Sequence, residues 1–424
     1  MTTIRVQQTH HLSGTLQAPR SKSYTHRAII AAALSNGWSE LRYPLICDDT
    51  EATLEACHCL GAHIKKEKDV IWIHGSKPTA PNEPIDCRES GSTLRFLIPV
   101  AALGHGDIHL TGRPSLLTRP IEPIMQALKQ LGIKATSHEG YPPAVIHGQG
   151  CINGGAVNIV GNVSSQYITG LLLACPLADN PTEINITTPL ESKPYVELTL
   201  DVLQKHQIAV DTSSDYRHFE VSSQQQYREY RHFIPGDFSS ASFLMVAAAI
   251  TQSKVSFSNL VKPQPDSAIL QLLTRMNCHV QEDGTSIHIQ GKALQGISID
   301  ATNVPDLVPA CAVAACLAQG ETVIMNAKRL RIKESDRLST LNLVLSEMGA
   351  SITESEDSLH ITGGSQLRGT VVKHQNDHRI AMAAAVAGLK AEGDTVIPNA
   401  ECVNKSYPTF FTDLQKLGAK IIVT

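Results

Sequence analysis

The sequence lacks the features that direct a chain into or across a membrane. Its longest apolar stretches, at residues 28–34, 309–318 and 381–389, span about ten residues, whereas a membrane-spanning helix needs about 20. The opening residues, MTTIRVQQTHHLSG, show no basic region followed by an apolar one and a small-residue cleavage site. We therefore expect a cytoplasmic protein that does not associate with a membrane.

Metal-binding cysteine patterns and a strong charge bias are also absent. None of the ten cysteines forms a CxxC pair, and no cysteine spacing matches a metal site, so we expect reduced, mostly buried thiols. The formal net charge is only −4, from 40 acidic and 36 basic residues. This balance argues against a broad nucleic-acid surface but permits a local basic pocket.

The sequence does contain an internal repeat. Six times, a helical run ends in a Leu-Gly-Ala-like turn that precedes alternating strand residues. Gly and Asn are the residues expected after a last helical turn, because they accept the left-handed conformation, and Gln207 fits poorly. The turns lie 69 to 75 residues apart, at Gly61, Gly132, Gln207, Asn277, Gly349 and Gly418.

Each repeat predicts two helices, because Ser and Asp are favoured N-caps and Pro is favoured at the first helical position. The first helices are expected to begin near Ser23, Ser92, Ser165, Ser240, Asp306 and Asp377. The second helices are expected to begin near Asp49, Pro120, Pro194, Asp266, Asp336 and Pro408. Each repeat therefore has the form βαβαββ.

The sixth repeat is one strand short, since only AKIIVT follows Gly418. The strand-like segment 3–10 belongs to no complete repeat, so we expect it to pair with the sixth. A chain of 424 residues is too long for one hydrophobic core. We predict an α/β fold with three repeats per domain: residues 14–233 form the first, and residues 1–13 with 234–424 form the second.

Positive charge is concentrated at the predicted helix starts. Helix N-termini attract anions, and small residues at 21–23, 90–93 and 164–166 would let an anion approach them. Ordinary capping would explain any one of these sites, but not their common phase. Nine cations lie within a turn of such starts: Lys22, Arg27, Arg95, Arg119, Lys193, Lys333, Arg337, Arg379 and Lys405. They predict a pocket for a small, heavily anionic ligand.

Carboxylates lie among these cations. Capping or ion pairing is the expected role of Asp48, Asp49, Asp336 and Asp377. Asp306 and Glu334 are better candidates for proton transfer. Glu334 lies between Lys333 and Arg337 in the sequence, and their charges would hold it ionised unless a bound anion or burial compensates.

Ten short runs of sequence carry a family resemblance. They are PRSKSYTHRA at 19–28, ESGSTLR at 89–95, SLLTRPI at 115–121, VSSQY at 163–167, SKPY at 192–195, PGDFSSASF at 235–243, VPD at 304–306, RIKESDRL at 331–338, NDHRIAMA at 376–383 and NKSYP at 404–408. In order and spacing they resemble the 5-enolpyruvylshikimate-3-phosphate (EPSP) synthase family of enolpyruvyltransferases.

The resemblance implies two inside-out α/β domains, each with three βαβαββ units, and an active site in the interdomain cleft. It also implies transfer of the enolpyruvyl group of phosphoenolpyruvate to the 5-hydroxyl of shikimate 3-phosphate, with release of phosphate. This is a step of the shikimate pathway, which leads to chorismate and the aromatic amino acids. A monomer that needs no cofactor and no metal is expected.

The resemblance also assigns roles to residues of this chain. Asp306 resembles the acceptor of the hydroxyl proton and Glu334 the acid that protonates the methylene, while Lys22 and Lys405 would assist departure of phosphate. Shikimate 3-phosphate is expected at Lys22, Ser23, Arg27, Ser164, Ser165, Gln166, Ser192, Tyr195, Asp306 and Lys333. Phosphoenolpyruvate is expected at Lys22, Gly91, Arg119, Gln166, Arg337, Arg379 and Lys405.

Some positions depart from the family pattern: Glu89 and Arg329 stand where other members have Asn, and Ser92 stands where Thr is frequent. A related enolpyruvyltransferase acting on UDP-N-acetylglucosamine is an alternative, but the loop at 112–119 lacks the reactive cysteine usual in that family. A non-catalytic scaffold that binds phosphorylated metabolites is a second alternative. Such a scaffold would not need Asp306 and Glu334 together.

Overall fold

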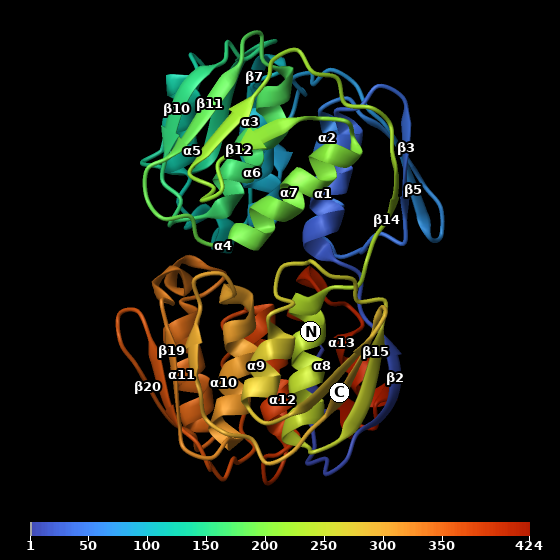
Figure 1. Ribbon diagram of the computed structural model, residues 1–424, viewed down its shortest axis with the longest axis vertical. Helices are drawn as coiled ribbons and strands as arrows, with labels where there is room; N and C mark the ends of the chain where they lie inside the picture. The colour runs from blue at the N-terminus through green and yellow to red at the C-terminus, as the bar shows by residue number, and fades with distance from the viewer. Residues whose placement is uncertain (1) are drawn as a thin grey trace. The chain divides into compact units, whose positions relative to one another are not determined.

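The computed structural model describes residues 2–424, which divide into two compact units (Figure 1). Ser21–Ile234 form what we call the N-terminal unit. Residues 2–20 and Pro235–Thr424 form the C-terminal unit. Both units combine small sheets with helices, in agreement with the α/β class predicted from the sequence.

The N-terminal unit contains three four-stranded sheets, each with one parallel and two antiparallel pairs, in the orders β14-β3-β5-β4, β6-β7-β9-β8 and β10-β11-β13-β12. Its strands are β3 (Trp38–Arg42), β4 (His63–Lys66), β5 (Val70–His74), β6 (Ile85–Asp86), β7 (His105–Thr111), β8 (Lys134–His138), β9 (Tyr141–Gln149), β10 (Gly155–Ile159), β11 (Thr182–Ile186), β12 (Val210–Thr212), β13 (His218–Val221) and β14 (Arg231–Phe233). Its helices are α1 (Lys22–Ala33), α2 (Asp48–Cys59), α3 (Gly91–Ala101), α4 (Pro114–Leu117), α5 (Glu122–Gln130), α6 (Ser165–Ala174), the 3-10 helix η1 (Cys175–Leu177) and α7 (Lys193–Lys205).

The C-terminal unit repeats this arrangement in two four-stranded sheets, β16-β17-β15-β2 and β18-β19-β21-β20, and its third sheet, β22-β1-β23, has three strands that are all antiparallel. Its strands are β1 (Ile4–Val6), β2 (Ser13–Gln17), β15 (Lys254–Ser258), β16 (His279–Asp283), β17 (Ser286–Gln290), β18 (Ser298–Asp300), β19 (Glu321–Met325), β20 (Ser351–Glu354), β21 (Leu359–Thr362), β22 (Thr395–Ile397) and β23 (Ile421–Val423). Its helices are α8 (Phe238–Ile250), α9 (Ile269–Arg275), η2 (Pro305–Leu307), α10 (Val308–Leu317), η3 (Lys328–Ile332), α11 (Arg337–Glu347), α12 (His378–Gly388), η4 (Ala400–Lys405) and α13 (Phe410–Lys416).

Two repeats exchange their first strands. β14 directly precedes α8 in the chain, yet it pairs in parallel with β3 of the first repeat. β2 directly precedes α1, yet it pairs in parallel with β15 of the fourth repeat. The predicted domain start at residue 14 is therefore wrong: β2 belongs to the C-terminal unit, and the division falls after Arg20. The second division falls after Ile234, one residue beyond the predicted position.

The N-terminal strand completes the sixth repeat, as the sequence predicts. β1 lies between β22 and β23 and is antiparallel to both, with Ile4 opposite Ile397 and Val423. It takes the place of the strand that the sixth repeat lacks.

All six predicted helix-ending turns adopt the left-handed conformation. Their φ angles range from 61° at Gln207 to 108° at Gly61. Gln207, the poor match in the sequence, therefore accepts the same backbone geometry as the glycines, without their conformational freedom.

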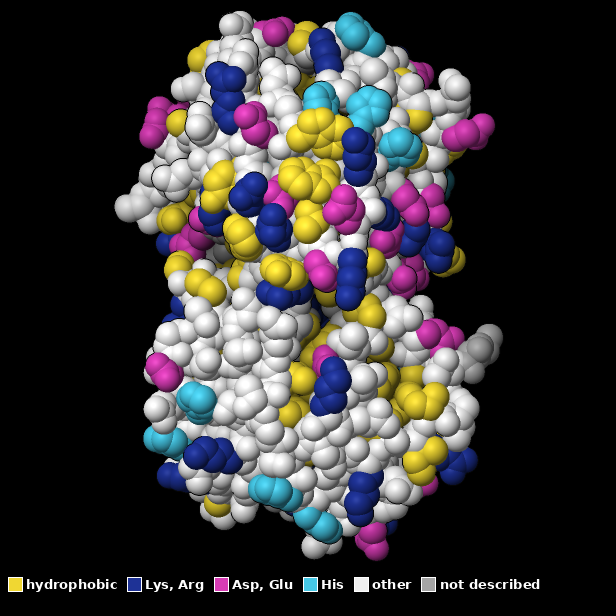
Figure 2. Space-filling view, turned by 90° about the vertical axis from the view of Figure 1, so that its right-hand side faces the viewer, with side chains coloured by type: hydrophobic (Ala, Val, Ile, Leu, Met, Phe, Trp, Pro, Cys, Tyr) yellow, Lys and Arg dark blue, Asp and Glu magenta, His cyan; other side chains and the backbone are white. Residues whose placement is uncertain are grey.

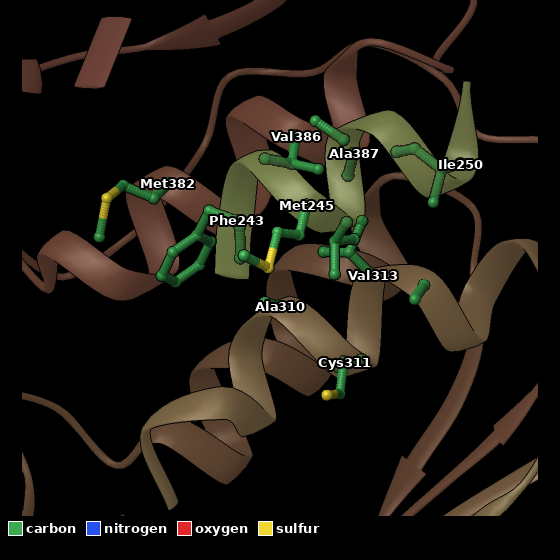
Figure 3. Packing of buried hydrophobic residues seen from close by; sticks show 14 of the residues in the cluster. Phe243, Met245, Ile250, Ala310, Cys311, Val313, Met382, Val386 and Ala387 are labelled. Carbon is green, nitrogen blue, oxygen red and sulfur yellow. The ribbon is translucent and has the colours of Figure 1, made fainter. Parts of the chain in front are cut away.

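Buried helices form the centre of the C-terminal unit (Figure 3). All residues of α8 and α12 are buried, and so are nine of the ten in α10. The three helices pack on one another, with Met245, Val313 and Val386 among the contacting side chains. A helix that is apolar on every side is expected only where protein surrounds it.

The remaining surface features fit a globular protein of mixed charge. On the face that Figure 2 shows, acidic and basic side chains are interspersed. Within residues 2–424, no helix is long and apolar enough to cross a membrane.

The ten cysteines are free thiols, and eight of them are buried, as the sequence predicts.

Candidate active site

The N-terminal unit uses serine side chains to begin three of its helices. Ser21, Ser90 and Ser164 are the N-caps of α1, α3 and α6, and their hydroxyls accept hydrogen bonds from Tyr24 N, Thr93 N and Gln166 N, respectively. Ser192, the N-cap of α7, adopts a left-handed φ of 55°. Serine satisfies exposed N–H groups without adding a negative charge, so these helix starts remain positive.

Arg27 ties the starts of three helices together. From one turn inside α1, its guanidinium donates to Thr199 Oγ1 at 2.8 Å and to the backbone oxygen of Tyr195 at 2.9 Å, both on α7. It also donates to Thr169 Oγ1 on α6 at 3.3 Å. Arg27 is only 2% exposed, and burial lowers its pKa to about 9. Ser23 belongs to the same cluster, because its backbone oxygen accepts from Arg27 at 2.9 Å.

A second cluster surrounds the first residue of α3. Arg95 donates to Gln166 Oε1 at 2.8 Å, and Gln166 donates to Ser92 Oγ at 2.9 Å. A Cβ atom on Gly91 would lie 3.1 Å from Arg119 Nη1 and 3.7 Å from Gln166 Oε1. Any larger residue at position 91 would therefore intrude on these polar groups. The structure thus brings together Gly91, Arg119 and Gln166, which the family resemblance assigns to one ligand.

Lys22, the first residue of α1, is held by a carboxylate from α2. Its Nζ lies 2.8 Å from Asp49 Oδ2, with the two side chains 16% and 7% exposed. The backbone oxygen of Asp49 accepts from Thr93 Oγ1 in α3 at 3.3 Å. The starts of α1, α2 and α3 are therefore connected.

In the C-terminal unit, one buried guanidinium contacts three carboxylates. Arg337, which is 1% exposed, lies 3.1 Å from Asp306 Oδ1, 2.5 Å from Glu334 Oε2 and 2.8 Å from Asp377 Oδ2. Burial lowers the pKa of Arg337, but Asp377, Glu334 and Asp306 outweigh burial and raise it. Arg337 is therefore a permanent cation at this site.

Asp306 lies between two arginines. Arg379 Nη2 lies 2.9 Å from Asp306 Oδ2, and Arg379 Nη1 donates to the Asp306 backbone oxygen at 3.2 Å. Burial raises the pKa of Asp306, but the charges of Arg379, Lys333 and Arg337 outweigh it and hold that pKa below its usual value. Asp306 is therefore ionised at neutral pH while these cations face it.

Lys333 has a lowered pKa. Burial is the main cause, and the nearby guanidinium groups of Arg329 and Arg337 add to it, so the pKa falls to about 8 although Asp306 opposes the change. Arg329, one of the departures from the family pattern, is buried and donates to the backbone oxygen of Thr302. Glu89, another departure, accepts from Ser115 Oγ at 2.8 Å.

Lys405 lies at the end of η4, is 4% exposed, and belongs to an element that packs against α12. The predicted residues therefore fall into two groups. The N-terminal unit carries Lys22, Ser23, Arg27, Gly91, Arg119, Ser164, Ser165, Gln166, Ser192 and Tyr195. The C-terminal unit carries Asp306, Lys333, Glu334, Arg337, Arg379 and Lys405.

Sequence reasoning missed the double role of two residues. Asp377 is the predicted N-cap of α12 and accepts from Arg379 N at 2.9 Å, but it is also the completely buried partner of Arg337. Arg95 was predicted only as one of the nine cations at helix starts, and it also orients Gln166. Its position one turn after Gly91 was the available signal. Among residues 2–424, no group of three or more His, Cys, Asp or Glu side chains could hold a metal ion.

Comparison with known proteins gives a consistent result. The family model described as EPSP synthase (3-phosphoshikimate 1-carboxyvinyltransferase) matches residues 6–414. The chain belongs to the EPSP synthase family. It is 44% identical over 419 residues to the 3-phosphoshikimate 1-carboxyvinyltransferase of Methanococcoides burtonii, with 97% of each chain covered. It is 40% identical over 426 residues to that of Methanocaldococcus jannaschii, with 99% of each covered.

Solved structures agree with this assignment. An EPSP synthase from Acinetobacter baumannii matches with a TM-score of 0.84 and 28% identity, and each chain is covered completely. The family, the transferase class and the two-domain fold predicted from the motifs are confirmed. Membership of this family also confirms the predicted enolpyruvyl transfer in the shikimate pathway.

Proposed function

We propose that Asp306 and Glu334 perform the proton transfers of this reaction, in which the enolpyruvyl group passes from phosphoenolpyruvate to the 5-hydroxyl of shikimate 3-phosphate. The observation that carries the proposal is the buried guanidinium of Arg337, which holds Asp306 and Glu334 beside each other. Carboxylates repel the anionic ligands that the family uses. Their presence here is explained by proton transfer, and a protein that only binds anions would not need them.

We assign shikimate 3-phosphate to Lys22, Ser23, Arg27, Ser164, Ser165, Gln166, Ser192, Tyr195, Asp306 and Lys333. The serine-capped helix starts would receive its phosphate through N–H groups and hydroxyls. Arg27 would act partly by holding those starts in place, because its donors are engaged by Thr199, Thr169 and Tyr195.

We assign phosphoenolpyruvate to Lys22, Gly91, Arg119, Gln166, Arg337, Arg379 and Lys405. Arginine suits its carboxylate and phosphate, because the planar guanidinium donates two parallel hydrogen bonds. The close approach of Arg119 to Gly91 supports this assignment, since the missing side chain leaves room for a ligand oxygen at the start of α3.

In the proposed reaction, Glu334 delivers a proton to the methylene carbon of phosphoenolpyruvate, and C2 gains oxocarbenium character. The 5-hydroxyl adds to C2 and gives its proton to Asp306. The tetrahedral intermediate then loses phosphate and returns a methyl proton to the Glu334 carboxylate, which restores the carbon–carbon double bond and the acid. Lys22 and Lys405 would stabilise the departing phosphate.

Substrate binding would raise the pKa of Asp306. Three cations hold the pKa of Asp306 low, which makes it a weak base. The substrates together bring about six negative charges, and anions beside Arg337 and Arg379 would offset the charges that depress this pKa. Asp306 would therefore become a better proton acceptor only when both substrates are bound.

Phosphate release tests the proposal. The purified protein should release inorganic phosphate only when shikimate 3-phosphate and phosphoenolpyruvate are both present, and mass spectrometry should find the enolpyruvyl ether in equal amount. A folded protein that releases no phosphate, or that releases it from phosphoenolpyruvate alone, would contradict the proposal. UDP-N-acetylglucosamine in place of shikimate 3-phosphate tests the related transferase activity and should give none.

We also propose that the protein acts as a monomer in the cytoplasm. Sedimentation of the purified protein should then give a single species near 45.8 kDa, with and without both substrates.

A further inference from the structure

A continuous chain of hydrogen bonds crosses the interior of the N-terminal unit, apart from the residues assigned above. Lys205 Nζ lies 3.0 Å from Tyr24 Oη, which lies 3.1 Å from His232 Nδ1. His232 Nε2 lies 2.9 Å from His206 Nε2, and His206 Nδ1 lies 2.6 Å from the backbone oxygen of Arg228. Tyr24, His206 and His232 are buried.

The direction of every hydrogen bond in this chain is fixed. A backbone oxygen only accepts, so His206 Nδ1 carries a hydrogen and, in the neutral ring, His206 Nε2 accepts. His232 must then donate from Nε2 and accept at Nδ1 from the Tyr24 hydroxyl. The Tyr24 oxygen in turn accepts from the ammonium group of Lys205. Every group is satisfied only while both imidazoles are neutral.

The surroundings keep the imidazoles neutral. Burial lowers the pKa of His206 to about 4, and burial with the nearby His206 and Lys205 lowers the pKa of His232 further. The groups that face the two rings are Tyr24 from α1, Lys205 with its partner Asp201 from α7, and Tyr227 and Tyr230 from the segment before β14. A proton added to Nε2 of His206 would place its N–H group against the Nε2–H group of His232.

The hydrogen-bond chain connects α1 and α7, which carry proposed ligand residues, with β14 (Figure 1). Tyr24 follows Lys22 and Ser23 in the first turn of α1. Lys205 is the last residue of α7, whose first turn contains Tyr195. His232 lies on β14, the last strand of the N-terminal unit before the chain passes to the other unit.

We propose that Lys205, Tyr24, His232 and His206 are positioning residues, which hold the first turn of α1 so that Lys22 and Ser23 meet shikimate 3-phosphate. The inference rests on the proposed function. None of the four is proposed to touch substrate. The hydrogen-bond chain holds α1 against α7 and β14. Breaking it should therefore change the affinity for shikimate 3-phosphate more than the rate of the chemical step.

Tyr24→Phe is the direct test, and Tyr227→Phe is its matched control. Both tyrosines are buried, and both substitutions remove a hydroxyl. Tyr24→Phe loses the two hydrogen bonds to His232 and Lys205, whereas Tyr227 Oη donates to the Leu173 backbone oxygen at 2.7 Å and lies outside this hydrogen-bond chain. In Tyr24→Phe, the dissociation constant for shikimate 3-phosphate, measured by calorimetry, should rise about threefold to tenfold. Tyr227→Phe should also lose stability towards urea, by no more than Tyr24→Phe, and should keep the wild-type dissociation constant.

Equal effects of the two substitutions on affinity, or no effect of Tyr24→Phe, would overturn the inference. Turnover gives a second readout: KM for shikimate 3-phosphate should rise in Tyr24→Phe while kcat stays within about twofold, and a fall in kcat alone would contradict a positioning role. The calorimetric comparison does not depend on turnover. A wild-type protein that binds shikimate 3-phosphate but releases no phosphate would therefore contradict the proposed function. The dissociation constants of Tyr24→Phe and Tyr227→Phe would still decide this inference.

The pH dependence of stability provides a further check. The histidine pKa values are lower in the folded than in the unfolded state, so the unfolded state binds protons first and stability falls as the pH drops from about 6.5 towards 4. The urea midpoint of His206→Gln should fall less over this range than that of the wild type. An equal fall would show that the two rings are not held neutral in this chain.

Discussion

The two units build helix starts of the same phase from different chemistry. The N-terminal unit caps α1, α3 and α6 with the serines Ser21, Ser90 and Ser164. The C-terminal unit caps the corresponding helices α8 and α12 with the aspartates Asp237 and Asp377, and it caps α11, a second helix, with Asp336. Serine caps leave the positive end of a helix available to an anion, whereas aspartate caps partly neutralise it.

The difference suggests that the two units, built from the same repeat, have different roles in the reaction. Hydroxyl caps and backbone N–H groups can receive an anion with little rearrangement. Arg337 and Arg379 of the C-terminal unit are already paired with carboxylates, so an anion that binds them would share or displace those contacts. The first arrangement suits binding, and the second couples binding to changes in the basicity of Asp306 and Glu334.

The largest expected effect is on the chemical step. Glu334→Gln keeps the size of the side chain but cannot deliver the proton, so kcat should fall roughly 100- to 10,000-fold. Urea unfolding should show a much smaller change in stability. The control is Glu356→Gln, because Glu356 pairs with Lys328 on the surface and both side chains are largely exposed. An unchanged kcat in Glu334→Gln would remove the catalytic distinction between the units.

Stability should separate the two kinds of cap. Asp377→Ala leaves the buried cation Arg337 without one of its carboxylates and should cost about 3 kcal/mol of unfolding free energy. Ser90→Ala removes a neutral cap, which also accepts from Thr93 Oγ1, and should cost about 1 kcal/mol. Urea denaturation of both variants provides the measurement. Equal losses would show that the Asp377 carboxylate contributes no more than an ordinary cap.

The smallest effect concerns pH. Lys333, with a pKa of about 8, is mostly cationic at pH 7 and mostly neutral at pH 9. Because the neutral amine attracts an anion less, KM for shikimate 3-phosphate should rise up to about tenfold between these values. Lys333→Arg stays charged and should remove most of the rise. A flat wild-type profile would mean that Lys333 does not bind this substrate as a cation.

Much of the fold could be predicted because each repeat carries its own boundary signals. Five of the six left-handed turns follow from the placement of Gly or Asn, the sixth, at Gln207, follows from the repeat spacing, and the pairing of β1 with the sixth repeat follows from the missing strand. The exchange of β2 and β14 could not be predicted. Both strands are short, and only one of the five residues of β2 is buried, so their sequences do not specify which parallel neighbour each one joins.

The site was predicted in part for a similar reason. Motifs identify residue types at helix starts, and these residues do gather in the folded units. Motifs do not show which charges pair. The contact of Arg337 with Asp377 spans 40 residues, and that of Tyr24 with His232 spans 208. Such long-range contacts depend on packing between repeats, which local periodicity does not encode.

The most direct test of these different roles is the dissociation constant for shikimate 3-phosphate in two variants, measured by calorimetry without phosphoenolpyruvate. Lys22→Met removes a cation from a serine-capped helix start and should weaken binding about tenfold or more. Glu334→Gln alters the carboxylate cluster and should stay within about twofold of the wild type. Equal weakening in both variants, or weaker binding in Glu334→Gln than in Lys22→Met, would contradict the account.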